Sequence, residues 1–66
     1  MTGLQLNRAR LRAKVSLRGL AARMGISAPY LCDLEKGRRD GEMAKAQIAR
    51  ARVVLFEMAE EKAERP

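Results

Sequence analysis

Residues 17–36, LRGLAARMGISAPYLCDLEK, decide the fold of this chain. Ala21 is small enough for two helices to touch there, and Gly25 can adopt the positive φ that a tight turn between them requires. Both helices also need apolar inner faces, which are provided by Leu20, Met24, Ile26, Leu31 and Leu34. Two short helices that cross steeply through a short turn form a helix-turn-helix, and the segment predicts that motif.

The composition limits what else the chain can be. With 66 residues it is one small domain, residues 1–66, near the lower size limit for a single core. It has no histidine and one cysteine, Cys32, which excludes a disulfide within one chain and a histidine-based metal or catalytic site. We therefore expect no cofactor, no metal and no enzymatic activity. The longest apolar run, Val53–Phe56, is too short for a membrane span, and the lone thiol fits a cytoplasmic protein.

The net charge of +6 is unevenly distributed along the chain. Residues 1–40 hold nine Lys and Arg against three Asp and Glu, whereas residues 41–66 hold five of each kind. A basic surface can serve solubility alone. Here the excess charge coincides with the helix-turn-helix, which favours a nucleic acid as partner.

Capping signals predict where the three short helices begin. Thr2 and Gln5 have the spacing of a capping box, which predicts a first helix over residues 4–14. Its expected inward residues are Leu4, Leu6 and Leu11. Ser16 and Ser27 are the expected N-caps of the two motif helices, residues 17–24 and 28–36.

Residues 42–64 predict one long C-terminal helix, because they contain neither proline nor glycine. Its expected core stripe is Ala44, Ile48, Ala51, Leu55 and Met58. Residues 53–58 are apolar nearly all round, so a second copy of the chain can cover what the monomer leaves open. The predicted homodimer interface comprises Val53, Val54, Phe56 and Met58. The alternative is that these residues only complete the core of a monomer.

Residues 16–39, SLRGLAARMGISAPYLCDLEKGRR, resemble the phage-repressor/Cro-type (XRE-like) helix-turn-helix family of DNA-binding regulators. The resemblance extends over residues 6–39, about half of the chain, and its pattern is specific. It implies an all-α, lambda-repressor-like domain in which three short helices carry the motif. The long helix over residues 42–64 departs from the family, whose members usually have shorter helices after the GRR segment. The resemblance also implies a partly buried ion pair between Arg10 and Glu35. Two solvated surface charges are the alternative.

The resemblance further implies how the domain contacts double-stranded DNA, with the helix over residues 28–36 in the major groove. The implied base-facing residues are Ala28, Pro29, Cys32 and Asp33. The implied phosphate contacts are Ser16, Arg18, Ser27, Tyr30, Lys36, Arg38 and Arg39.

The four base-facing residues depart from an ideal DNA reader, since none is an Arg, Asn or Gln. Asp33 can accept a hydrogen bond from a cytosine amino group or pair with Lys36 within its helix. Cys32 is a small filler or, alternatively, a redox-sensitive thiol. Part of the specificity is therefore expected to come from DNA shape or from Arg38 and Arg39.

The expected function is a sequence-specific transcriptional regulator, a dimeric repressor that acts at a palindromic operator. The alternative is an antitoxin or mobile-element operon regulator that binds DNA and docks a protein partner through residues 53–58.

Overall fold

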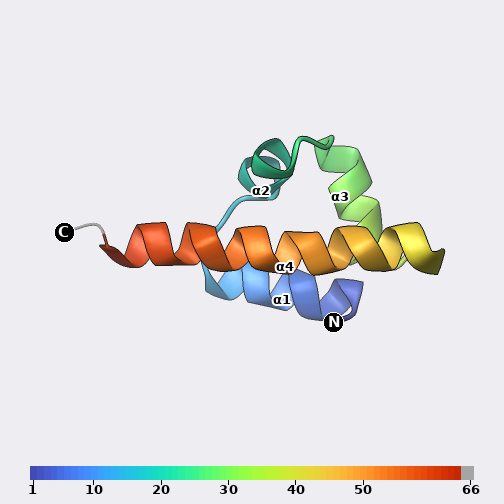
Figure 1. The fold of residues 1–66 in the computed structure, drawn as a ribbon, viewed down its shortest axis with the longest axis horizontal. Coiled ribbons are helices and arrows are strands. Elements are labelled where there is room, and N and C mark those ends of the chain that lie inside the picture. Colours follow the sequence, from blue (N-terminus) through green and yellow to red (C-terminus); the bar gives the residue numbers. More distant parts are fainter. Residues whose placement is uncertain (65–66) are drawn as a thin grey trace.

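A computed structural model describes residues 1–64, and all regular structure within them is helical (Figure 1). The helices are α1 (Gly3–Arg12), α2 (Leu17–Met24), α3 (Ala28–Glu35) and α4 (Gly41–Glu64). α4 runs along the longest dimension of a molecule that measures 40 × 20 × 16 Å (Figure 1). The prediction of three short helices and one long one is confirmed. The last two residues of the predicted domain, 65–66, lie outside the described residues.

The four helices pack as a closed ring around one aliphatic core. α1 and α2 each pack against both α3 and α4. The largest fully buried side chains are Leu6, Leu20, Met24, Leu31 and Leu34. Burying each side chain of this size stabilises the fold by roughly 1.5–3 kcal/mol. Three of the four helices supply these five side chains, and α4 adds the buried residues Ala44, Ile48, Ala51 and Leu55.

Side-chain caps fix the starts of the three short helices, as predicted. The Thr2 hydroxyl accepts a hydrogen bond from the Gln5 backbone N–H at 3.1 Å, and the Gln5 side chain accepts one from the Thr2 N–H at 2.9 Å. Ser16 and Ser27 each accept from the N–H three residues later, at 3.0 and 3.3 Å. Each such cap contributes about 1 kcal/mol.

The predicted inner face of α1 is wrong in two of its three residues. Leu6 is fully buried, but Leu4 and Leu11 are 56% and 59% exposed. Leu4 and Leu11 lie seven residues apart on one side of α1, whereas α3 and α4 pack against the opposite side. α1 also ends at Arg12, before the predicted end at Lys14, because Lys14 has a φ of 57° that no right-handed helix allows.

α4 begins one residue earlier than predicted, at Gly41, and extends to Glu64. Four residues of the predicted stripe are buried, and Met58 is half-buried against the core. No helix in the described part of the chain is both long enough and apolar enough to cross a membrane.

Gly3 marks a very close backbone contact that the sequence analysis did not identify. It is buried in the first turn of α1, against the C-terminal turn of α3. A Cβ atom at this position would lie 2.0 Å from the Leu34 carbonyl oxygen and 3.0 Å from that of Glu35. Only a residue without a side chain allows α1 and α3 to approach this closely.

Candidate nucleic-acid interface

The connection between α2 and α3 is a three-residue turn, residues 25–27. Gly25 has a φ of 72°, a left-handed conformation that glycine adopts without strain. Its N–H donates to the Ala22 carbonyl at 3.1 Å, and the Ile26 N–H donates to the Ala21 carbonyl at 3.0 Å. These bonds satisfy the last carbonyls of α2 and set the direction in which α3 leaves.

A buried charged network fixes the C-terminal end of α3 on α1. Glu35, with its side chain 4% exposed, accepts hydrogen bonds from Arg10 Nε at 2.8 Å and from Arg10 Nη2 at 3.2 Å. Asn7 Nδ2 donates to the same carboxylate at 2.8 Å, and Arg10 Nη1 donates to the Val15 carbonyl at 2.9 Å. The structure thus contains the implied Arg10–Glu35 pair, in which the guanidinium holds the carboxylate with two nitrogens.

Asn7 was missed by the sequence analysis. The only available signal was its spacing, because a residue three positions before Arg10 lies on the same face of α1. An asparagine at that spacing is too common on helix surfaces to predict a buried hydrogen bond.

The four residues implied to face DNA bases lie on one accessible side of α3. Pro29 is exposed, and Ala28, Cys32 and Asp33 are half-buried. Leu31 and Leu34 occupy the opposite side and are fully buried. The structure therefore brings the predicted base-facing residues together, with the free Cys32 thiol among them.

The residues implied to contact phosphates are also accessible. Six are exposed and Tyr30 is half-buried; the exposed ones are Ser16, Arg18, Ser27, Lys36, Arg38 and Arg39. Ser16 and Ser27 cap helices as hydrogen-bond acceptors. Their hydroxyl protons remain available, because a hydroxyl group can accept and donate at once.

Four side chains at the edge of α3 form an electrostatic cluster, which we call the α3 edge cluster: Tyr30, Asp33, Arg38 and Arg39. The Arg39 guanidinium lies 5.3 Å from the centre of the Tyr30 ring, within cation–π range. The Asp33 carboxylate lies 3.6 Å from Arg38 Nη1 and 3.9 Å from Arg39 Nε. Within residues 1–64, these two arginines are its ion-pair partners. Our alternative of a pair with Lys36 is therefore wrong, because the chain after α3 folds back toward Asp33.

Two other basic side chains are engaged elsewhere. Arg23 Nη1 donates to Glu61 Oε1 at 3.2 Å, and this hydrogen bond, with the nearby charges of Glu61 and Glu57, raises the pKa of Arg23. Lys62 Nζ donates to the Ala13 carbonyl at 3.4 Å and also to the Lys14 carbonyl. Both contacts tie α4 to the rest of the fold.

The apolar residues predicted for a homodimer interface divide into two pairs. Val53 and Phe56 are 60% and 65% exposed. Val54 and Met58 are half-buried and pack against the core of their own chain. Near residues 53–58, α4 is therefore exposed on only part of its surface, because α2 packs on one of its sides.

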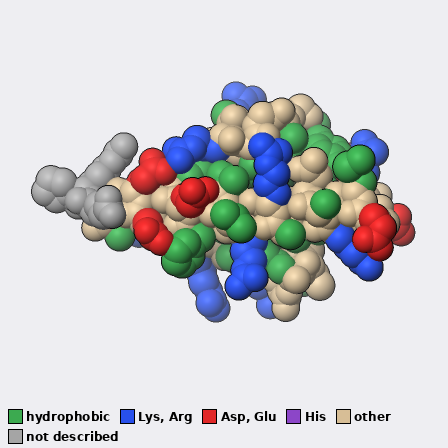
Figure 2. Space-filling model, viewed as in Figure 1, with side chains coloured by type: hydrophobic (Ala, Val, Ile, Leu, Met, Phe, Trp, Pro, Cys, Tyr) green, Lys and Arg blue, Asp and Glu red, His purple; other side chains and the backbone are tan. Residues whose placement is uncertain are grey.

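Acidic side chains gather over the C-terminal half of α4, with basic ones on both sides of the helix (Figure 2). Among residues 1–64, no three His, Cys, Asp or Glu side chains lie close enough together to hold a metal ion. Comparison with known proteins found no family model, no curated protein and no solved structure that matches this chain. A functional assignment therefore depends on the site itself.

Proposed function

We propose that this chain is a sequence-specific double-stranded DNA-binding regulator of the phage-repressor/Cro type. In this proposal it is a cytoplasmic repressor that acts as a homodimer at a palindromic operator. The observation that supports it best is the exposed side of α3, held at a fixed angle by the Gly25 turn and the Glu35 network and flanked by Arg38 and Arg39.

The proposal assigns α3 to the major groove, which is wide enough to admit a helix. Pro29 and Ala28 offer apolar surface to thymine methyl groups, and Asp33 can accept from a cytosine amino group. In α2 the N–H groups of Leu17 and Arg18 are available to phosphate oxygens. In α3 only the Ala28 N–H is, because Pro29 has none and the Tyr30 N–H donates to Ser27. Arg18, Lys36 and the two arginines of the α3 edge cluster supply the positive charge.

The direct test is a titrated binding assay with the DNA upstream of the chain's own gene and with scrambled DNA, at two salt concentrations. We expect tighter binding to the first duplex. In the same assay, Arg39→Ala should weaken binding to both duplexes and reduce the slope of log K against log salt by about 1, because one phosphate contact is lost.

Arg8→Ala is the matched control, since it removes one exposed positive charge from α1 that is assigned neither to DNA nor to the contact between copies. It should leave the slope unchanged. Equal affinity of the wild type for the two duplexes would contradict sequence-specific binding. A slope that Arg39→Ala leaves unchanged would remove Arg39 from the phosphate contacts.

Asp33→Asn should separate non-specific from specific binding. The carboxylate partly neutralises Arg38 and Arg39, and it must be displaced when these arginines meet phosphates. Losing its charge should raise the affinity for scrambled DNA about two- to fivefold, as expected for exposed ion pairs. Affinity for the operator should rise less, because an amide also changes the group that faces the bases. Equal gains on both duplexes would exclude Asp33 from base recognition.

A second candidate is an antitoxin or mobile-element regulator that docks another protein while bound to DNA. The exposed pair Val53 and Phe56 favours a protein contact of some kind.

A further inference from the structure

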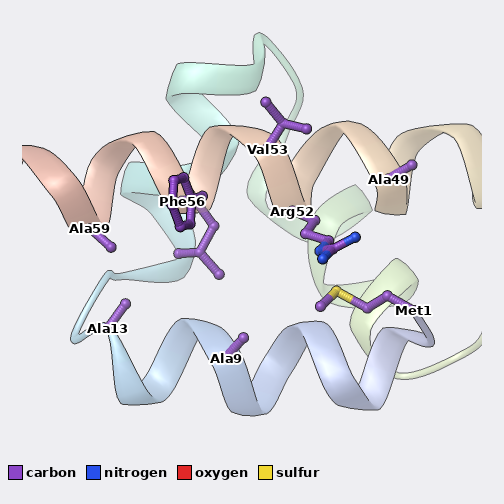
Figure 3. A pocket seen from close by; sticks show the side chains of 9 residues that line it. Met1, Ala9, Ala13, Ala49, Arg52, Val53, Phe56 and Ala59 are labelled. Atoms are coloured by element: carbon purple, nitrogen blue, oxygen red, sulfur yellow. The ribbon is translucent and has the colours of Figure 1, made fainter.

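A shallow groove of about 640 Å³ lies between α1 and α4 (Figure 3). Its lining is mainly apolar and includes four alanines: Ala9 in α1, Ala13 directly after α1, and Ala49 and Ala59 in α4. Phe56 lies near Ala59 on α4, and Arg52 points from α4 toward α1 (Figure 3). No residue of α2 or α3 lines the groove. A partner seated there leaves the accessible side of α3 free.

We infer that this groove receives α4 of a second copy of the chain, antiparallel and related by a two-fold axis close to Phe56. The groove carries what such self-pairing requires. It offers a large exposed aromatic side chain beside a hollow lined by alanines, so each copy supplies both the projecting group and the space for it. A two-fold contact is self-complementary only when both features lie on one surface.

The distribution of charge along α4 determines whether the two α4 helices pair parallel or antiparallel. Before Phe56 the exposed charged residues of α4 are Glu42, Lys45, Arg50 and Arg52, with a positive excess; after it they are Glu57, Glu60, Glu61 and Lys62, with a negative excess. Parallel pairing would place like charges side by side. Antiparallel pairing instead sets the basic half of each helix along the acidic half of the other.

The spacing of the residues around Phe56 then determines which side chains of the two copies face each other. Arg52 precedes Phe56 by four residues and Glu60 follows it by four, so all three share one side of α4. An axis at Phe56 therefore places Arg52 of each copy opposite Glu60 of the other.

This inference differs from the interface predicted from sequence. It keeps Val53 and Phe56, excludes Val54 and Met58 because they pack inside their own chain, and adds Ala9 and Ala13. It supplies the homodimer that the proposed function requires, but its evidence does not involve DNA.

Sedimentation equilibrium measured over a range of concentrations tests the pairing. The wild-type chain should approach twice its mass of 7.4 kDa. Phe56→Glu should raise the dimer dissociation constant about 30-fold or more, as for a central aromatic anchor. Met43→Glu is the matched control, because Met43 is 69% exposed on α4 and does not line the groove. It should sediment like the wild type. Circular dichroism verifies that each variant is folded.

Charge reversal tests the orientation. Arg52→Glu and Glu60→Arg should each weaken pairing, and the double variant should restore it, since each reversed charge again meets its opposite. A wild type that stays at 7.4 kDa, a Phe56→Glu variant that still dimerises, or a double variant that stays monomeric would overturn the inference. Arg39→Ala, by contrast, should leave the dimer intact, so failure of DNA binding and failure of pairing are distinguished.

Discussion

Replacing Glu35 by alanine is expected to lower the free energy of unfolding by about 3–5 kcal/mol, because it leaves the Arg10 guanidinium without its partner in a site that is only 11% exposed. Asn7 loses its acceptor at the same time. A domain of this size has a total stability of only about 3–10 kcal/mol, so the variant should be largely or wholly unfolded at 37 °C. Urea titration followed by circular dichroism measures the loss.

A double replacement distinguishes the cost of leaving Arg10 as an unpaired buried charge from the cost of losing side-chain packing. In Arg10→Met with Glu35→Leu, no charge remains buried, and the two apolar side chains fill a similar volume. The double variant should recover most of the stability that Glu35→Ala loses, since apolar pairs often replace buried ion pairs without cost. If Glu35→Ala unfolds at the same urea concentration as the wild type, the Arg10–Glu35 pair does not stabilise the fold.

Gly3→Ala is expected to be comparably damaging, although it adds only one methyl group. The new Cβ would lie 2.0 Å from a carbonyl oxygen of α3, and that oxygen belongs to a helix backbone that cannot turn aside. α1 must therefore move away from α3, which disturbs both the burial of Leu6 and the Arg10–Glu35 pair. We expect a loss of about 3 kcal/mol or more, at the upper end of overpacking effects.

Gly19→Ala provides the comparison, since Gly19 also lies within a helix. Its Cβ would lie 2.9 Å from the Ser16 hydroxyl oxygen, which is the end of a side chain. A small shift of that cap is offset by the better helix propensity of alanine, worth about 1 kcal/mol. The thermal midpoint should therefore change little for Gly19→Ala and fall steeply for Gly3→Ala. Equal midpoints for the two variants would contradict the close contact.

The sequence predicted the local elements well because their signals are local. A capping hydroxyl acts three residues away, and Gly25 needs its positive φ whatever surrounds it. The all-helical class and the long fourth helix followed from the same kind of signal. The positions implied for DNA contact also proved accessible, since the face of a short helix is set by its two buried leucines.

What the sequence could not predict depends on which neighbours each helix has. Leu4 and Leu11 have the spacing of an inward face, yet both are more than half exposed, because α1 packs on α3 and α4 through its other residues. From the sequence, Gly3 is only a poor helix former, and its role depends on the close packing of α3 against it. Likewise, Val54 and Phe56 are almost adjacent in sequence, but only the position of α2 decides that the first is half-buried and the second exposed.

The closed ring of helices also affects how the protein folds during synthesis and how truncated chains are degraded. The ribosome completes the helix-turn-helix before it reaches Ala44 and Ile48, so the core of the nascent chain is covered only once α4 has been made. A stop codon or a protease cut within residues 37–40 would leave every residue of the motif in place. The fragment would still lack the helix against which both α1 and α2 pack. Such truncation should therefore yield a degraded peptide and not a competing half-protein.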